Sequence, residues 1–533
     1  MGGIELFSPP SSPALGRHSL TSTRWRPSLL TTACCLANLF VFVLYHHHFT
    51  SSQPTQPQDV QLEVLRDDVP TANSSAAVTP PSRALSCEVC HLDPSNPLCE
   101  YGYSAIRQSR AYEGSGTRLR RVLQKALRGE AIQVGVLGAS VTQGHGVIPP
   151  YQRWEDRWFE EFQHIFPSAV MHVGAVPAAG SQFFSYCFGS VVSSDLDLYL
   201  VELDINNDVS FDTMQEDDSL MRGLLGLPQQ PAVIRLSVFA LLFEELARGS
   251  TSSLSTSQFF DVPVISIRNF LLPYVIKHRE AAEELFSLTS WGERDYRHIS
   301  GLGHQAAADM LSLFVRKEIC EAQRHETLPP PPPRTGPWPV DEDLESIPEL
   351  ALSSSWIHPK PILPLNPICQ STMTPLTLMV PLSHSPTFEF ETWNDKSAWS
   401  SSTPGAQIRF RFVGSRVSIF VWATNGRGEL EQSPEKAIRR REAPGSALCW
   451  IEDEEMGAEE WLAKYGEDGD EADSAETDYW EVNSHVPTYV ASTSDFVELT
   501  SGLEPRSHIL ACEVSSNTTS GGHRWRIQGI ASQ

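Results

Sequence analysis

The sequence predicts a three-layer α/β domain with a parallel sheet, followed by an antiparallel β-sandwich domain. Two patterns in the 533 residues lead to this prediction. From residue 132 to about 325, apolar strand segments alternate with helical segments, which is typical of βαβ units and of a parallel sheet covered on both faces. After residue 350, short segments alternate between apolar and polar residues, which indicates an antiparallel sandwich. We therefore expect a flavodoxin-like domain within 86–325 and a sandwich within 351–533.

The N-terminus is expected to anchor the chain in a membrane. An uncharged apolar run at 29–45 is close to the ~17–25 residues that a membrane-spanning helix needs. Residues 1–28 contain three arginines and one acid, which predicts a cytoplasmic tail by the positive-inside rule. The chain would then be a single-pass type II membrane protein with its catalytic domain in the secretory lumen or outside the cell. A cleaved signal peptide is the alternative, but no clear small-x-small cleavage site follows the run.

Three further segments are expected to lie outside the folded domains. Residues 46–85 are rich in Ser, Thr, Pro and Gln and are predicted to be a disordered stalk. A linker is expected at 326–350, where five consecutive prolines precede a cluster of acids. The acidic insertion 452–481 contains a single lysine and is predicted to be a solvated loop, with a metal or cationic partner as the alternative. The sequons at Asn73 and Asn517 fit a lumenal chain and are predicted glycosylation sites.

The cysteines predict disulfides. Cys34 and Cys35 fall in the apolar run, where they could pack or be acylated. Eight others would face an oxidising compartment: Cys87, Cys90, Cys99, Cys187, Cys320, Cys369, Cys449 and Cys512. An even number in such a compartment favours disulfides. The alternative is a zinc site built on Cys87-x2-Cys90 with Cys99, but no fourth ligand is spaced to complete it.

The periodicity places the elements of both domains. Strands of the α/β domain are expected at 132–137, 169–173, 197–203, 232–238 and 263–267, and helices at about 117–128, 153–165, 181–188, 212–225, 269–286 and 302–323. Strands of the sandwich are expected at 407–413, 416–422, 487–491, 508–512 and 524–529.

The first functional candidate is Ser140, which follows the strand at 132–137 in the turn Gly-Ala-Ser-Val-Thr. In open α/β sheets, ligands bind in the crevice beyond the carboxyl ends of the strands. A serine at that edge is a candidate nucleophile. On spacing alone, a helix N-cap is the commoner role for such a serine.

Three later segments supply candidate partners for Ser140. An Asp295-x-x-His298 pair stands just before the last helix, where the carboxylate can bind one imidazole nitrogen and leave the other facing the crevice as a general base. Asn206 follows the third strand, and its side-chain amide could donate to an oxyanion. The small-residue loop 174–181 follows the second strand and could bring a backbone N–H close to a substrate.

The order of these four signals resembles that of the SGNH (GDSL-like) hydrolase family, and more narrowly a fungal type II membrane-anchored form with a C-terminal β-sandwich. The resemblance covers about 117–325 and includes the segment Gly-Ser-Gly-Thr-Arg-Leu-Arg-Arg before the first strand. It implies that Ser140 is the nucleophile, His298 its base and Asp295 the residue that orients the histidine. It also implies an oxyanion hole made of the Ser140 backbone N–H, the Asn206 side chain and a backbone N–H best aligned to Ala178.

The chain departs from the family pattern around these residues. Ala139 stands where the family usually has Asp, and Ala178 replaces the usual Gly. Asp204 replaces a Gly before Asn206, and Asn207 replaces an Asp. A charge at Asp204 would oppose a developing oxyanion unless that side chain points away.

We expect a serine esterase that hydrolyses ester groups on carbohydrate, most plausibly O-acetyl groups, without a cofactor or a metal. Alternatives are a glycan O-acetyltransferase with the same three residues, and an inactive glycan-binding or scaffold protein. The 65 acidic and 40 basic residues argue against nucleic-acid binding. The expected partners are a carbohydrate or other ester substrate and the membrane. Six tryptophans of the sandwich could stack on sugars, but most are expected to be core residues: Trp393, Trp399, Trp422, Trp450, Trp480 and Trp525.

Overall fold

The computed structural model describes residues 86–243, 251–289, 292–328, 336–359, 362, 367–425, 443–453, 478–489 and 492–533. Several predicted features lie outside these residues: the tail, the anchor, the stalk with Asn73, the prolines of the linker and most of the acidic segment 452–481. Within the described ranges, no helix is both long enough and apolar enough to cross a bilayer.

The first domain is built on a six-stranded sheet with the order β1-β6-β5-β4-β2-β3. Its strands are β1 Arg110–Tyr112, β2 Gln133–Gly138, β3 Val170–Ala175, β4 Leu198–Glu202, β5 Ala232–Ser237 and β6 Val264–Ser266. Strands β2 to β6 are parallel, and β1 runs antiparallel to β6 at the edge. Numbered among themselves, the parallel strands have the flavodoxin-like order 2-1-3-4-5. The predicted parallel α/β domain is confirmed.

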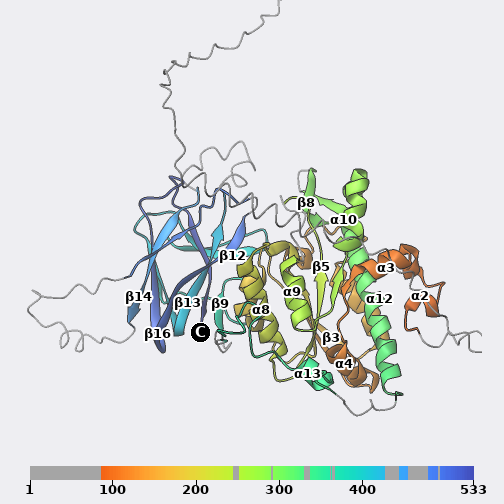
Figure 1. Ribbon diagram of the computed structural model, residues 1–533. Coiled ribbons are helices and arrows are strands. Elements are labelled where there is room, and N and C mark those ends of the chain that lie inside the picture. Colours follow the sequence, from red (N-terminus) through yellow and green to blue (C-terminus); the bar gives the residue numbers. More distant parts are fainter. Residues whose placement is uncertain are drawn as a thin grey trace, which may run out of the picture. The chain divides into compact units, whose positions relative to one another are not determined.

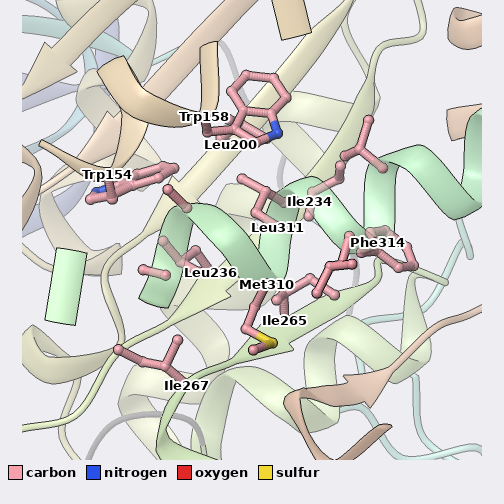
Figure 2. Close-up of a cluster of buried hydrophobic side chains, with 14 of the residues drawn as sticks. Trp154, Trp158, Leu200, Ile234, Leu236, Ile265, Ile267, Met310, Leu311 and Phe314 are labelled. Carbon is pink, nitrogen blue, oxygen red and sulfur yellow. The ribbon is translucent and has the colours of Figure 1, made fainter. Parts of the chain in front are cut away.

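Helices cover both faces of this sheet. They are α4 Thr117–Leu127, α5 Ser140–Gln143, α6 Trp154–Ile165, α7 Ser181–Val191, α8 Phe211–Leu225, α9 Thr251–Phe259, α10 Arg268–Lys277, α11 Ala282–Leu285 and α12 Gly301–His325. Apolar side chains of α4, α6, α10 and α12 form one buried cluster with the strands, part of which Figure 2 shows. Side chains of α7 and α8 form a second cluster on the other face. Figure 1 shows α8 and α9 on one side of β5 and α12 on the other.

Strand β4 illustrates why the central strands of the sheet are mostly apolar. Leu198 and Leu200 belong to the first buried cluster, whereas Tyr199 and Val201 belong to the second. Successive side chains of a strand point to opposite faces, so a strand covered on both faces reads as a continuous apolar run. This pattern made the parallel strands predictable.

Small elements complete the α/β domain. At its N-terminal end lie α2 Val89–Leu92, the 3-10 helix η2 Pro97–Tyr101 and α3 Tyr103–Ser109. Before α12, the strands β7 Phe286–Leu288 and β8 Arg294–Ile299 form a two-stranded sheet. Two disulfides, Cys90–Cys99 and Cys87–Cys320, hold the N-terminal elements together and join them to α12.

Two helix predictions were wrong in detail. The helix expected at 269–286 is divided into α10, the 3-10 helix η4 Arg279–Ala281 and α11, and Pro273 lies inside α10. Helix α9 was not predicted, because its sequence Thr-Ser-Ser-Leu-Ser-Thr-Ser-Gln-Phe lacks an apolar stripe with helical spacing.

The second domain is one nine-stranded antiparallel sheet that curls into a sandwich. Its strands are β9 Ile368–Ser371, β10 Ser383–His384, β11 Glu389–Trp393, β12 Lys396–Ser401, β13 Gln407–Ala423, β14 Ser446–Asp453, β15 Trp480–Asn483, β16 Thr493–Val514 and β17 Trp525–Ser532. The main order is β11-β12-β17-β13-β16-β14-β15, with β10 paired to β13 and β9 to β17. Figure 1 shows β13, β14 and β16 side by side. The predicted antiparallel sandwich is confirmed.

Two strand predictions in the sandwich were wrong. The runs 407–413 and 416–422 form one long strand, β13, because the residues around Gly414 make a bulge rather than a turn. The run 487–491 is not a strand: residues 487 and 488 lie in a turn, and 490 and 491 lie outside the described residues.

All eight cysteines outside the apolar run form disulfides, which confirms that prediction and shows that the zinc alternative was wrong. Besides the two described above, Cys449–Cys512 joins β14 to β16, and Cys187–Cys369 joins α7 to β9. The last bond links the two domains. Around it the second buried cluster also contains Phe420 and Ala531 of the sandwich, so the α/β domain and the sandwich share part of one core.

The six sandwich tryptophans differ in burial. Trp422 and Trp525 are buried. Trp399 and Trp480 are partly buried and pack against the sandwich core. Trp393 and Trp450 are also partly buried, but they lie outside that core cluster.

Candidate active site

Ser140 lies at the carboxyl end of β2, as the first residue of the short helix α5. The N-cap of that helix is Ala139, so the alternative that Ser140 is an N-cap was wrong. The turn is tight, as Gly138 shows: a Cβ at this position would lie 1.9 Å from Oγ1 of Thr142. Glycine at 138 therefore allows the strand to reverse into α5 and leaves the Ser140 hydroxyl for another partner.

That partner is His298. Its Nε2 lies 2.9 Å from Oγ of Ser140, and its Nδ1 lies 2.6 Å from Oδ2 of Asp295. Ser140 and His298 are only 6% and 7% exposed, so both side chains are largely shielded from solvent. Burial alone would raise the pKa of Asp295, but the hydrogen bond and charge of His298 hold that pKa below its usual value. An ionised Asp295 fixes the imidazole with Nδ1–H toward itself and leaves Nε2 to accept the serine proton.

Asp295 and His298 lie on strand β8, not in a loop as predicted. Residues three apart on a regular strand point to opposite faces. Here Oδ1 of Asp295 accepts a hydrogen bond from the backbone N–H of Arg297, and the pairing of β7 with β8 is irregular at the same place. This local turn bends the strand, so the carboxylate and the imidazole meet.

The buried carboxyl group of Glu202 contacts the turn at Ser140. Oε2 of Glu202 accepts a hydrogen bond from Oγ1 of Thr142 at 3.0 Å, and Nε1 of Trp154 approaches the same Oγ1 at 3.3 Å. Burial raises the pKa of Glu202 to about 8 against the opposing effect of the Thr142 hydrogen bond. Burial also raises the pKa of the nearby Glu155 to about 8. A pKa near 8 favours the protonated form of Glu202 at neutral pH. Nε of Arg153 lies 3.3 Å from Oε1 of Glu155 and opposes protonation there.

Ala178 occupies a turn after β3. The N–H of Ala179 donates to the carbonyl of Val176 at 3.1 Å, and Ala178 has a φ of 68°. With Pro177 before it, this matches a type II turn, which requires a positive φ at its third residue. Ala178 thus adopts a backbone conformation that favours glycine. Its carbonyl accepts a hydrogen bond from Oγ1 of Thr493, a residue of the sandwich.

Asn206 closes the 3-10 helix η3 Asp204–Asn206, which follows β4 at the same edge of the sheet as Ser140 and Ala178. The neighbouring charge at Asp204 is directed into the protein. Oδ1 of Asp204 accepts a hydrogen bond from Oγ of Ser253 at 2.7 Å and lies 3.6 Å from Nη1 of Arg235. Burial raises the pKa of Asp204, and the charge of Arg235 opposes that rise. Asp204 is therefore held by the core.

A buried polar network fixes both ends of η3. Nη2 of Arg235 binds both oxygens of Asp217, at 2.8 and 2.9 Å, and Oδ1 of Asp217 accepts from Oγ of Ser181. The backbone N–H of Ser181 donates to Oδ1 of Asn207, and Nδ2 of Asn207 donates to Oγ of Ser181, both at 2.8 Å. Arg235 also pairs with Asp204. The network therefore anchors Asp204 and Asn207, which lie on either side of Asn206. Gly180 permits this contact, since a Cβ there would lie 2.8 Å from Oδ1 of Asn207.

Two further histidines surround His298. The ring of His145 lies 5.1 Å from that of His298, and its Nε2 lies 3.6 Å from Oδ2 of Asp395 in the sandwich. Burial, together with the positive charges of His298 and Lys396, lowers the pKa of His145 to about 4. His304 is fully buried and accepts from the backbone N–H of Trp154, and burial lowers its pKa to about 3. Both imidazoles are neutral at neutral pH, which leaves His298 as the histidine of this group placed to take the serine proton.

The structure shows no metal cluster in its described part: no three His, Cys, Asp or Glu side chains there are placed to hold a metal ion. A cavity of about 750 Å³ lies between α7, α8 and the chain leading into β9. Its lining includes Tyr186, Arg222 and Cys369 but none of the predicted site residues. This cavity is separate from the edge of the sheet where Ser140 lies.

The fold has counterparts among solved structures. A crystal structure of a two-domain esterase active on acetylated mannans, co-crystallized with mannopentaose, matches with 17% sequence identity and a TM-score of 0.52. The match covers 80% of this chain and 97% of that chain. Another structure of a two-domain esterase active on acetylated mannans matches with 15% identity and a TM-score of 0.51, over 80% of this chain and 98% of that one. No family model and no curated protein matches the chain. The shared feature is the two-domain architecture.

Several residues around the site were not anticipated from the sequence. Arg235 could have been noticed, because it is a charge inside the apolar strand Ala-Val-Ile-Arg-Leu-Ser. Glu202 similarly ends an apolar strand. In contrast, nothing local to the sequence indicates that Asp395 and Lys396 of the sandwich lie near His145. Their proximity depends on how the two domains pack.

Proposed function

We propose that this protein is a serine esterase that removes O-acetyl groups from carbohydrate, with Ser140 as nucleophile, His298 as general base and Asp295 as the residue that orients the histidine. The observation that carries the proposal is the continuous hydrogen-bonded series from Ser140 through His298 to Asp295 at the carboxyl edge of a parallel sheet. Such a series on an α/β scaffold is the arrangement that activates a serine in acyl transfer.

The proposed reaction has two steps. Oγ of Ser140 attacks the acetyl carbonyl while Nε2 of His298 takes its proton, and the sugar oxygen leaves with that proton as a free hydroxyl. Water then attacks the acetyl-serine with His298 again as the base, which releases acetate and restores Ser140. The negative oxygen of each tetrahedral intermediate would be stabilised by the backbone N–H of Ser140, the side chain of Asn206 and a backbone N–H at Ala178.

The carbohydrate part of the proposal is supported by the structural neighbours that act on acetylated mannans. Their identity to this chain is low, so the sugar itself is proposed only as a class. We further propose that the chain is a type II membrane protein whose two domains face the secretory lumen or the outside. The four disulfides support an oxidising compartment.

The test measures hydrolysis of an activated acetyl ester and of an acetylated oligosaccharide by the two-domain chain and by its Ser140→Ala and Asp295→Asn variants. We expect Ser140→Ala to lower kcat by about 10⁴-fold or more, and Asp295→Asn by up to about 10⁴-fold, as in other serine triads. Ser193→Ala, at a surface serine, is the matched control and should leave kcat unchanged. Equal background turnover by the parent chain and Ser140→Ala would refute the esterase. Acetylation of an added sugar acceptor would instead indicate a transferase.

A further inference from the structure

A turn of the sandwich places charged groups beside the proposed catalytic histidine. Strands β11 and β12 are joined by Asn394 and Asp395, both with positive φ, in the two-residue turn typical of tight hairpins. Oδ2 of Asp395 lies 3.6 Å from Nε2 of His145, whose ring contacts that of His298. The hairpin of one domain therefore contacts a histidine that lies next to His298 of the other.

Lys396 is the next residue of this hairpin, and its charge lacks a carboxylate partner. Its ammonium lies 5.4 Å from the ring centroid of Trp422 and donates a long hydrogen bond of 3.4 Å to the carbonyl of Asn394. In the part of the chain that the structure describes, no carboxylate lies within ion-pair distance of Nζ, about 4 Å. The adjacent carboxylate, Asp395, is directed to His145.

The charge of Arg297, a residue of the α/β domain, acts on Lys396. Arg297 lies on β8 between Asp295 and His298. Burial lowers the pKa of Lys396 to about 8, and the charge of Arg297 lowers it further, against the opposing charge of Asp395. The two cations thus repel each other in a partly buried position, although the chain as a whole carries a formal net charge of −25. An anion bound to Lys396 would oppose this loss of its charge.

An aromatic surface adjoins Lys396. Trp393, at the base of the same hairpin, packs edge-on against Trp422 with ring centroids 5.6 Å apart, and it is only partly buried. Amphipathic tryptophan rings suit the apolar faces of sugar rings. The guanidinium carbon of Arg526 lies over one face of the Trp393 ring, 4.6 Å from its centroid. A sugar ring would therefore have to use the other face, with the charge of Lys396 nearby for an acidic substituent.

We propose that the ester acted on here is carried by an acidic sugar, and that Lys396 binds the carboxylate of that sugar while its acetyl group reaches Ser140. This inference rests on the proposed esterase function and specifies its substrate class as acetylated glycans that contain uronic acid. The hairpin of the sandwich is then a specificity element for a reaction whose chemistry belongs to the α/β domain.

The experiment compares two acetylated oligosaccharides with the same linkages, one containing uronic acid and the other with its carboxyl groups reduced to alcohols. We expect the parent chain to prefer the acidic oligosaccharide by about tenfold in kcat/KM, mainly through a lower KM. Lys396→Gln should abolish that preference, and Lys396→Arg should keep most of it. The matched control is Lys125→Gln, because Lys125 pairs with Asp197 before the amino end of β4, away from the site. Equal kcat/KM for the two oligosaccharides with the parent chain, or an unchanged preference in Lys396→Gln, would overturn the proposal.

A binding measurement separates this proposal from the esterase itself. If the parent chain hydrolyses no acetyl ester, the proposed esterase function is refuted. Calorimetry with the deacetylated acidic and reduced oligosaccharides then decides whether the carboxylate site exists. Tighter binding of the acidic form that is lost in Lys396→Gln would support the carboxylate site. Equal binding of both forms, or none, would reject it.

Discussion

At the scale of single residues, Ala139 shows how the turn before Ser140 is packed. Ala139 is fully buried and packs with Leu137, Val176 and Ala179 in the second core cluster. An aspartate at this position would place a charge in an apolar contact, which costs free energy unless a partner is supplied. The alanine therefore suits its surroundings, while the hydroxyl of Ser140 keeps its contact with His298.

Glu202 gives a prediction for stability. Its folded pKa of about 8 lies above the ordinary value, so the folded state holds a proton that the unfolded state releases between about pH 4.5 and 8. The contribution of this carboxyl to the free energy of unfolding is therefore greatest at low pH. It falls as pH rises, by up to about 1.4 kcal/mol per pH unit. We expect Glu202→Gln, which cannot lose a proton, to weaken this decline in denaturant titrations from pH 5 to 8.

Part of the decline should remain in Glu202→Gln, because burial raises the pKa of Glu155 as well. The exposed Glu130 provides the control: Glu130→Gln should show the same pH dependence as the parent chain. If Glu202→Gln and the parent chain lost stability with the same slope, a buried protonated Glu202 would be contradicted.

At the scale of elements, the proposed oxyanion hole depends on close contact between the turn at Ala178 and η3. Gly180 has an extended backbone, so alanine is allowed by its conformation but not by its surroundings. Its Cβ would lie 2.8 Å from Oδ1 of Asn207 and 3.1 Å from the carbonyl of Asn206. We expect Gly180→Ala to move η3 and to lower kcat on an activated acetyl ester by about 10- to 100-fold, since misplacement of a site by ~1 Å has effects of this size.

Gly189 is the matched control for this substitution. It lies inside α7, the helix that Gly180 precedes, and a Cβ there would meet only Oγ of Ser194, at 3.2 Å. Gly189→Ala should leave kcat near that of the parent chain and should not reduce stability, because alanine favours helix over glycine. If Gly180→Ala left kcat unchanged, the idea that catalysis depends on the position of η3 would be contradicted.

The sequence was sufficient for most elements of the α/β domain and insufficient for contacts between domains. The parallel strands were predictable because burial on both faces produces continuous apolar runs. Strand β13 was divided in the prediction because Gly414 and its neighbours resemble a turn, although long-range pairing with β16 carries the strand through a bulge.

The three candidate catalytic residues could be predicted from the sequence, but the residues that surround them could not. Ser140, Asp295 and His298 stand at strand ends or beside a helix start, where local pattern indicates position. The buried pairing of Arg235 with Asp204 and the approach of Lys396 depend on segments far apart in the chain. Such pairings are set by tertiary packing, which local periodicity does not encode.

At the scale of the whole molecule, the two domains are joined by covalent and apolar contacts. The disulfide Cys187–Cys369 closes a separation of 182 residues. Beside it, Phe183 packs on Phe420 with ring centroids 5.0 Å apart, and Tyr186 stacks on Phe496 at the same separation. These contacts join α7 of the α/β domain to β9, β13 and β16 of the sandwich.

The proposed lumenal placement gives a prediction for the intact chain. Asn517 is exposed in the loop between β16 and β17, where a glycan can be attached without disturbing the core. Expressed in a secretory host, the full chain should carry a glycan at Asn517, seen as a mobility shift after N-glycosidase treatment. Asn517→Gln should remove that shift at this position, whereas Asn425→Gln, outside any sequon, should not. Absence of glycans from both Asn73 and Asn517 would contradict the lumenal placement.

The hairpin between β11 and β12 also has a consequence for how such proteins diverge. The proposed chemistry uses residues of the α/β domain, whereas the turn at Asn394 and Asp395 belongs to the sandwich. Insertions or substitutions in this turn can change which esters enter without altering the groups that cleave them. Hairpin turns tolerate such changes better than buried strands do. New substrate preferences could therefore be acquired through a few residues of the second domain while the reaction mechanism is inherited unchanged.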